Sequence, residues 1–249
     1  MKFYGLTDRG IERVDNQDTF HIRNVPSRSC SVIAICDGMG GQNSGNFASE
    51  LACRAFSEYV LAKLTSRKNR NPDIREVLRC GCEEANSVVY TYAGFTEAYK
   101  GMGSTLVGGV VYDSGKCCIV NVGDSRAYFL SQRNSSIRQI TNDHSLVEMY
   151  VRAGILTREQ AKSRKDRNII TRAIGAEETV ESDLFEITMK HGDLLMMCSD
   201  GVTNHISDEE ILAFAREYPD PEDFCVQLKR IVYSRGAKDN LTVIAVKNR

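Results

Sequence analysis

The sequence predicts an α+β fold in which antiparallel sheets are covered by helices. Strand-like and helix-like patterns alternate as strands, two helices, strands, two helices and a last strand, and the links between neighbouring strands are of hairpin length. Short links join antiparallel neighbours, and blocks of strands separated by pairs of helices are typical of α+β proteins. We therefore expect sheets with helices packed on their outer faces.

Length and composition predict a single domain. The chain has 249 residues, 42% of them hydrophobic, and it shows no repeat, linker or low-complexity segment. A chain of this size buries about 70 to 75% of its extended surface on folding, so it needs neither disulfides nor a structural metal. Residues 1–249 are therefore expected to form one domain.

Three runs near the N-terminus have the composition of strands. β-branched and aromatic residues dominate residues 2–8, 18–23 and 30–36. The third run, "CSVIAIC", is apolar enough to be buried on both faces. It is expected to be a central strand.

The next segment changes to a helical period. From Ser44 to Val60 the apolar residues fall on one stripe. A second helix is expected to begin near residue 71, where Pro72 and Asp73 suit a first turn, and to continue to about residue 93. These two helices are expected to pack side by side outside a sheet.

The remaining elements follow the same two patterns. A polar, helix-prone stretch extends from about residue 142 to 175. Strands are expected within 104–130 and at 182–188, 193–200 and 241–246, and helices at 207–218 and 222–236.

The cysteines indicate buried side chains in a reducing compartment. Several of the nine lie within apolar runs, Cys36 and Cys198 among them, and no pair has the CxxC spacing of a zinc knuckle. Free cysteine behaves as a small hydrophobe. Neither a disulfide framework nor a zinc cluster is expected.

Charge and hydropathy exclude several classes of partner. With 32 basic and 33 acidic residues the formal net charge is −1, which offers no field for nucleic acid. The N-terminus reaches charged residues too soon for a secretory signal, and no apolar stretch approaches the ~20 residues that span a bilayer. The expectation is a cytoplasmic protein that binds neither membrane nor nucleic acid.

Two glycine-rich segments resemble nucleotide-binding loops only in part. Residues 40–45, "GGQNSG", have the glycine spacing of a phosphate-binding loop, but Asn46 and Phe47 stand where lysine and a hydroxyl residue are required. Residues 101–106, "GMGSTL", lack the third glycine of the dinucleotide fingerprint. Nucleotide binding is therefore disfavoured.

Aspartates recur where predicted strands begin or end. Any one of them, next to glycine or asparagine, could be an ordinary surface turn. Five of the same kind indicate a constellation, and carboxylates without histidine or thiolate partners suit Mg²⁺ or Mn²⁺ rather than zinc. The five are Asp18, Asp37, Asp124, Asp200 and Asp239.

The order of motifs resembles the metal-dependent serine/threonine protein phosphatase family (PPM, or type 2C), in particular its single-domain bacterial-type members. Eight matching runs cover nearly the whole chain in family order. They are "TDRGIERVDNQD", "ICDGMGGQNSGNFAS", "GMGSTLVGGVV", "VNVGDSRAYFL", "QITNDHSLV", "RNIITRAIG", "LLMMCSDGVTNHIS" and "KDNLTVIAV".

The resemblance implies a fold and an activity. The fold is a four-layer α-β-β-α sandwich of two antiparallel sheets flanked by helix pairs, with a flap at about residues 143–175 beside a metal site. The activity is hydrolysis of phosphoserine and phosphothreonine in proteins through a water activated at a binuclear Mn²⁺ or Mg²⁺ centre. The implied partners are phosphorylated proteins and an opposing serine/threonine kinase, and a monomer is expected.

The same resemblance assigns roles to single residues. Asp37 would bridge two ions, and the Gly38 carbonyl would bind one of them. Asp124 would help to bind a third, weaker ion. Arg13 would hold the substrate phosphate, because its planar fork donates two hydrogen bonds at once. Asp200 and Asp239 would bind the first ion, Asp18 would support the cluster, and Asp37 and Asp239 are the expected catalytic residues.

Two positions depart from the family pattern. Gln17 stands where many members have glutamate, so the second ion is expected to bind more weakly or through water. Met39 stands where eukaryotic relatives often have histidine, and it cannot donate a proton to the leaving group. His144, the histidine nearest to the motifs, is expected to make a structural hydrogen bond.

Gln17 also leaves an alternative function open. A pseudophosphatase would keep the fold and bind phosphoproteins without turnover, and Gln17 is the feature that supports it. The intact aspartates oppose it. Phosphate release separates the two functions.

Overall fold

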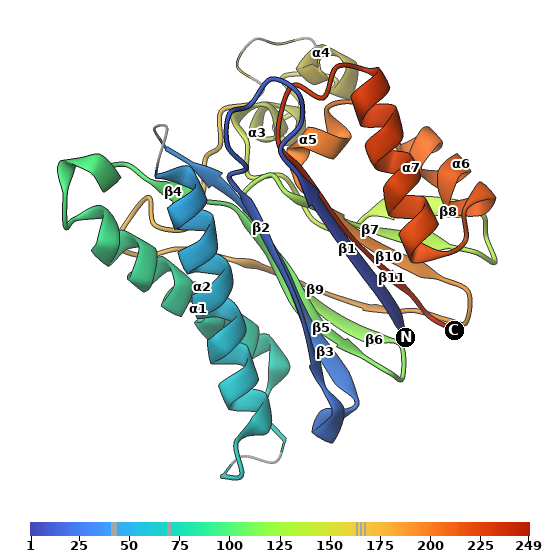
Figure 1. Cartoon of the computed structure of the whole chain (residues 1–249), viewed down its shortest axis with the longest axis horizontal. Helices are drawn as coiled ribbons and strands as arrows, with labels where there is room; N and C mark the ends of the chain where they lie inside the picture. Colours follow the sequence, from blue (N-terminus) through green and yellow to red (C-terminus); the bar gives the residue numbers. More distant parts are fainter. Residues whose placement is uncertain (41–43, 69–70, 163, 165, 167) are drawn as a thin grey trace.

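The computed structural model describes residues 1–40, 44–68, 71–162, 164, 166 and 168–249. Two antiparallel sheets face each other, and helix pairs cover their outer faces (Figure 1). The first sheet has the order β2-β3-β5-β6-β9, with the short β4 beside β3, and the second has the order β1-β11-β10-β7-β8. The predicted α+β sandwich is confirmed.

The strands of the first sheet lie mostly where the sequence predicts them. They are β2 (Asp18–Val25), β3 (Cys30–Met39), β4 (Gly103–Ser104), β5 (Leu106–Tyr112), β6 (Lys116–Val122) and β9 (Asp183–Thr188). The helices α1 (Gly45–Thr65) and α2 (Ile74–Ala93) lie against this sheet. Pro72 and Asp73 precede α2 rather than form its first turn, and the Asp73 carboxylate caps it by accepting from the Arg75 amide.

The second sheet contains one strand that the sequence does not predict. Its strands are β1 (Lys2–Asp8), β7 (Arg126–Ser131), β8 (Ser136–Gln139), β10 (Leu194–Cys198) and β11 (Leu241–Lys247). The unexpected strand is β8, whose four residues alternate between exposed and half-buried positions. On the outer face lie α5 (Asp200–Thr203), α6 (Asp208–Glu217) and α7 (Pro221–Ser234).

The alternation of side chains along β3 explains the layers. Val32, Ala34 and Cys36 belong to the core between the first sheet and α1 and α2. Ile33 and Ile35 point the other way, into the core between the two sheets. A third core lies between the second sheet and α6 and α7. Three apolar layers thus hold four layers of structure together, which is why "CSVIAIC" has no polar face.

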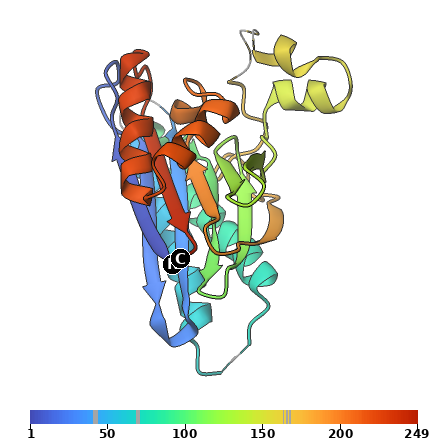
Figure 2. The same cartoon turned by 90° about the vertical axis from the view of Figure 1, so that its right-hand side faces the viewer.

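The middle of the segment between β8 and β9 projects from the sandwich, while its ends, at Ile140 and Ile174, pack into the cores. It includes α3 (Leu146–Arg152) and α4 (Arg158–Lys162), which project beyond the strand ends (Figure 2). The two chain termini lie at the opposite end, because Lys2 of β1 pairs with Lys247 of β11 (Figure 1). The projecting segment therefore borders the end of the sandwich that is distant from the termini.

All nine cysteines are free, and all except Cys80 are buried. The prediction of small buried cysteines without disulfides agrees with this structure. Among the described helices, none combines the length and apolarity that a membrane span requires.

Candidate active site

The five predicted aspartates come together at one end of the sandwich. Asp18 begins β2 and lies opposite Asp37 in the register of β2 and β3. Asp124 lies in the turn between β6 and β7. Asp200 follows β10 and Asp239 precedes β11. The other four are near enough for their charges to act on Asp37. Strand ends that are far apart in the sequence thus place five carboxylates in one group.

Burial and mutual repulsion make four of these carboxylates hard to ionise: Asp18, Asp37, Asp124 and Asp200. Burial raises the pKa of Asp37 well above its usual range, and the charges of the other aspartates raise it further. Burial also raises the pKa of Asp18 and of Asp124 to about 7. The pKa of Asp200 is raised by burial and by Asp239. Such a group favours either protons or a bound cation.

One carboxylate oxygen in the group lacks a partner. Asp18 is only 6% exposed, and its Oδ2 accepts a hydrogen bond of 2.7 Å from the Ser199 hydroxyl. Its Oδ1 is buried and has no hydrogen-bond partner among the described residues. An orphaned buried carboxylate oxygen is costly unless a cation or proton reaches it. The donor set therefore fits a hard divalent cation.

The described side chains are not yet arranged as a complete coordination site for a metal ion. Among the residues that the structure describes, no three histidine, cysteine, aspartate or glutamate side chains converge closely enough to hold one ion. Two of the carboxylates point to other partners. The Asp200 carboxylate accepts 2.9 Å from Nδ2 of the Asn204 side chain, and the Asp239 carboxylate accepts 2.8 Å from Nη2 of Arg13. Each of these two bonds uses a single carboxylate oxygen, Oδ2, so both side chains keep lone pairs that a cation can use.

The backbone at Gly38 is enclosed on two sides. The strand β3 continues through Asp37 and Gly38 as far as Met39, and the Gly38 amide donates 3.0 Å to the Gln17 carbonyl. A Cβ atom on Gly38 would lie 1.9 Å from the carbonyl oxygen of Gly45. Only glycine fits this position. Gly40 follows β3 with a φ of +145°, a conformation that favours glycine, and the next glycine, Gly41, lies outside the described residues.

Arg13 lies on a loop that Asn240 holds in place. The Asn240 side chain donates 2.9 Å to the carbonyls of both Arg9 and Asp15, and it accepts 2.8 Å from the Gln17 amide. Arg13 is thereby brought beside Asp239. Sequence reasoning missed Asn240, although it directly follows Asp239 in the motif "KDN". The sequence signal that could have identified it is the residue type, because an asparagine side chain can both donate and accept hydrogen bonds.

Thr105 connects Asp37 to the turn that contains Asp124. Its hydroxyl accepts 3.0 Å from the Asp37 amide and lies 2.8 Å from the Ser125 hydroxyl. Its own amide donates 2.8 Å to the Asp37 carbonyl. No sequence pattern pointed to Thr105, because its role depends on the pairing of β3 with the chain near β4 and β5.

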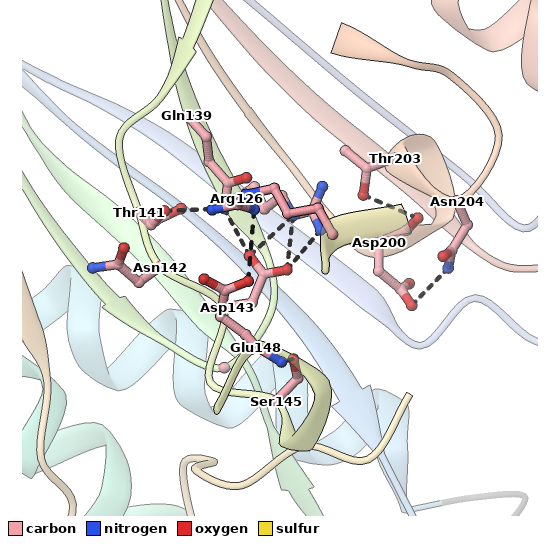
Figure 3. A network of polar contacts seen from close by, with 12 residues as sticks. Arg126, Gln139, Thr141, Asn142, Asp143, Ser145, Glu148, Asp200, Thr203 and Asn204 are labelled. Atoms are coloured by element: carbon pink, nitrogen blue, oxygen red, sulfur yellow. Dashed lines mark hydrogen bonds and ion pairs between the residues drawn. The ribbon is translucent and has the colours of Figure 1, made fainter. Parts of the chain in front are cut away.

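A cavity of about 590 Å³ opens beside the aspartates. Asp124 and Asp200 contribute to its wall, α3 and α4 border it on one side, and α5 and α6 border it on the other. Arg126 and Asp143 form an ion pair in the same wall (Figure 3). The candidate site therefore extends from the aspartates to the projecting segment.

His144 has the structural role that the sequence predicts. It is 8% exposed, its Nδ1 accepts 3.0 Å from the Gly123 amide, and its Nε2 lies 3.4 Å from Asp183. Since Nδ1 accepts, the ring proton is on Nε2 and faces Asp183. Burial and Arg172 lower the pKa of His144. The ring is thus a neutral structural bridge.

Comparison with known proteins gives a consistent result. The sequence pattern described as protein phosphatase 2C matches residues 12–241. The serine/threonine phosphatase stp of Listeria welshimeri is 36% identical over 97% of this chain and 93% of its own length.

Two solved structures match over nearly the full length. The serine/threonine phosphatase of S. agalactiae is 32% identical, covers 100% of this chain and 99% of its own, and has a TM-score of 0.90. The catalytic domain of the serine threonine protein phosphatase PstP, in complex with two manganese ions, is 28% identical, covers 99% and 97%, and has a TM-score of 0.82. The predicted resemblance is confirmed: this chain belongs to the protein phosphatase 2C family.

Proposed function

We propose that this protein is a Mn²⁺- or Mg²⁺-dependent phosphatase that removes phosphate from phosphoserine and phosphothreonine in proteins. The observation that carries the proposal is the group of five aspartates beside Arg13, with the raised pKa values of Asp18, Asp37, Asp124 and Asp200. Its membership of the phosphatase family and its similarity to named serine/threonine phosphatases support the same activity.

The aspartates are the proposed metal ligands. Asp37 would bridge two ions, and the Gly38 carbonyl would bind one of them. Asp200 and Asp239 would bind the first ion, and Asp18 would support the cluster through its unpartnered Oδ1. Asp124 is the proposed ligand of a third. Bound divalent cations lower the pKa of water and neutralise phosphoryl oxygens. That PstP was solved with two manganese ions supports this ion type.

Arg13 is the proposed phosphate-binding residue. Its guanidinium uses Nη2 on Asp239, and half of its side chain is exposed to solvent. Burial opposes its charge, but the hydrogen bond and the charge of Asp239 raise its pKa. A permanently charged planar fork at the edge of a carboxylate cluster can receive two oxygens of a phosphoryl group.

The cluster also determines what can enter. Five carboxylates would repel a phosphate dianion, so substrate binding needs the charge of the cluster to be offset. Arg13 supplies one positive charge from the chain itself. The proposed cations would supply the rest, which is why we expect no substrate turnover without metal.

The alternative of a pseudophosphatase has less support. It rests on Gln17, whose backbone accepts from Gly38 and donates to Asn240. All five aspartates and Arg13 are gathered at one end of the sandwich, as turnover requires. We therefore favour the enzyme.

The setting of this activity is also proposed. Residues 1–249 would form one phosphatase domain, with residues 143–175 as the flap beside the site. Phosphorylated proteins would be the substrates, opposite a serine/threonine kinase, and the proposed state is a cytoplasmic monomer.

The test is phosphate release from a phosphothreonine peptide with Mn²⁺, with Mg²⁺ and with EDTA. We compare wild type with Asp239→Asn, and we use Asp223→Asn, an exposed aspartate on α7, as the matched control. Wild type and the control should turn over only with metal. Asp239→Asn should lose about 100-fold or more, since a metal clamp supplies several kcal/mol of transition-state stabilisation. Turnover in EDTA, or full activity of Asp239→Asn, would disprove the proposal.

A further inference from the structure

The first residues of the flap hold the turn that contains Asp124. Two nitrogens of Arg126 donate to Asp143: Nε lies 2.9 Å from Oδ1 and 3.0 Å from Oδ2, and Nη2 lies 2.6 Å from Oδ2 (Figure 3). Gln139 donates a further 2.7 Å to Asp143. Arg126 also donates 3.0 Å to the Tyr128 hydroxyl. A planar bidentate pair of this kind fixes the direction of both side chains.

The neighbouring residue holds the other side of the same turn. The His144 amide donates 3.0 Å to the Gly123 carbonyl, and the His144 ring accepts 3.0 Å from the Gly123 amide. Gly123 has a φ of +106°, and a Cβ atom there would lie 2.7 Å from Thr105. The backbone before Asp124 is thus fixed by two hydrogen bonds and by close packing.

The returning end of the flap reaches the same place. The Thr171 amide donates 2.8 Å to the His144 carbonyl, and the Leu146 amide donates 2.9 Å to the Ile169 carbonyl. Arg172 lies 3.1 Å from His144 Nε2 and donates 3.1 Å to Asp183. Both ends of the flap are therefore joined at His144.

Asp124 lies between the two residues that are held. Gly123 precedes it and is bonded to His144, while Arg126 follows two positions later and is bonded to Asp143. Asp124 and Arg126 both line the cavity. A movement of the flap base would displace the turn on both sides of Asp124.

We propose that Asp143 and His144 are positioning residues, a clamp through which the flap sets the place of Asp124 and thereby its affinity for a divalent cation. The proposal rests on the role proposed above for Asp124. In other metalloproteins, mutating a residue that orients a metal ligand typically lowers the metal affinity by about 10- to 100-fold. The clamp would orient the Asp124 carboxylate in the same way, by holding Gly123 and Arg126 on either side of it.

The test is a calorimetric Mn²⁺ titration of the whole folded protein, which measures the half-saturating Mn²⁺ concentration directly. A loss of stability alone lowers the melting temperature, but at a temperature where each variant is folded it leaves the half-saturating Mn²⁺ concentration unchanged. Asp143→Asn removes the ionised acceptor, and Arg126→Lys keeps the charge but loses the fork. Each is made in wild type and in Asp124→Asn.

If the clamp acts through Asp124, the effect of each variant on Mn²⁺ binding should depend on whether Asp124 is present. In wild type, each variant should raise the half-saturating Mn²⁺ concentration about tenfold. In Asp124→Asn, the same changes should have little further effect, because coupled residues are not additive. The matched control is Asp220→Asn, which breaks an ion pair with Lys2 at the opposite end of the sandwich and should not shift the titration.

The remaining outcomes separate the two proposals. An equal shift in both backgrounds, or no shift in wild type, overturns the clamp and leaves the metal-dependent function standing. An Asp124→Asn protein with the same half-saturating Mn²⁺ concentration as wild type also overturns the clamp and leaves the metal-dependent function standing. A wild-type protein that binds no Mn²⁺ in the titration overturns both. If Asp143→Asn does not fold, Arg126→Lys provides the same comparison.

Discussion

Arg13 donates a hydrogen bond of 2.8 Å from Nη2 to Oδ2 of Asp239. This bond joins two residues that are 226 positions apart. One is the proposed phosphate-binding residue and the other is a proposed metal ligand. It orients the arginine across the carboxylate group, and its side chain remains half exposed. The proposed substrate-binding and metal-binding groups are therefore in direct contact.

Replacing Arg13 should weaken phosphopeptide hydrolysis without unfolding the protein. A hydrogen bond to a charged group is worth about 1.5 to 3 kcal/mol, so Arg13→Ala should lower kcat/KM by about 10- to 150-fold. An exposed ion pair contributes only about 0 to 1 kcal/mol, so the melting temperature should change little. Arg13→Lys should be intermediate, since lysine keeps the charge but not the fork. The measurement is kcat/KM with a phosphothreonine peptide.

A matched control comes from the same loop. Arg9 donates to the Val14 carbonyl, so Arg9→Ala makes the same change in charge nearby. Its kcat/KM should remain within about twofold of wild type. Equal losses in both variants would mean that the charge of the loop, and not the position of Arg13, is what the substrate requires.

The sequence predicts the aspartates of this site better than it predicts the residues that hold their segments in place. The strand patterns and family motifs together identify Asp18 and Asp37 as candidate ligands. The register of β2 and β3 places these two residues opposite each other. Asn240 and Thr105 were missed, because their partners lie on distant segments. The strand β8 was missed because its four residues have no apolar alternation, and α5 because four residues are too few for a helical period.

Stability without metal should fall as the pH rises. Burial raises the pKa of Asp18 from 3.8 to about 7, so the folded protein keeps a proton that the unfolded chain releases near pH 4. Its contribution is therefore complete below pH 4 and is lost as the pH rises to about 7. Between pH 5 and 7 this amounts to about 2 kcal/mol for one such group.

Melting curves in EDTA measure this effect. The melting temperature should fall by about 5 to 10 °C between pH 5 and pH 8, at about 2 to 4 °C per kcal/mol for a protein of this size. With Mn²⁺ the decrease should be smaller, because cations bind the ionised carboxylates. In Asp18→Asn the decrease in EDTA should be reduced. A melting temperature that rises with pH in EDTA would contradict the burial of these carboxylates.

Changing Gly38 to alanine should disrupt the site through the backbone. A Cβ atom there would lie 1.9 Å from the Gly45 carbonyl and 2.8 Å from the Gln17 carbonyl, so β3 or α1 must shift. Overpacking of this kind costs about 1 to 3 kcal/mol or more. We expect a lower melting temperature and little phosphate release. The control is Gly94→Ala, whose new Cβ would come no closer than 3.4 Å to any atom and which should be neutral.

Changing Gln17 to glutamate should strengthen metal binding at the expense of the metal-free protein. The Gln17 side chain packs against Gly45, where an added Cβ atom would lie 2.7 Å from its Cδ. A sixth carboxylate at this position increases the repulsion among the aspartates, so the melting temperature in EDTA should fall. With Mn²⁺ the same charge is favourable, and the half-saturating concentration should fall about tenfold.

A negative charge added far from the aspartates should change neither the melting temperature in EDTA nor the half-saturating Mn²⁺ concentration. Gln227→Glu on α7 makes the same substitution away from the aspartates, so its Mn²⁺ titration should match wild type. If Gln17→Glu also matches wild type, the side chain at this position does not face the ions. If it binds more tightly and turns over faster, Gln17 is the residue that limits the native protein. That result would relate the departure from the family pattern to a measurable weakness of the second ion.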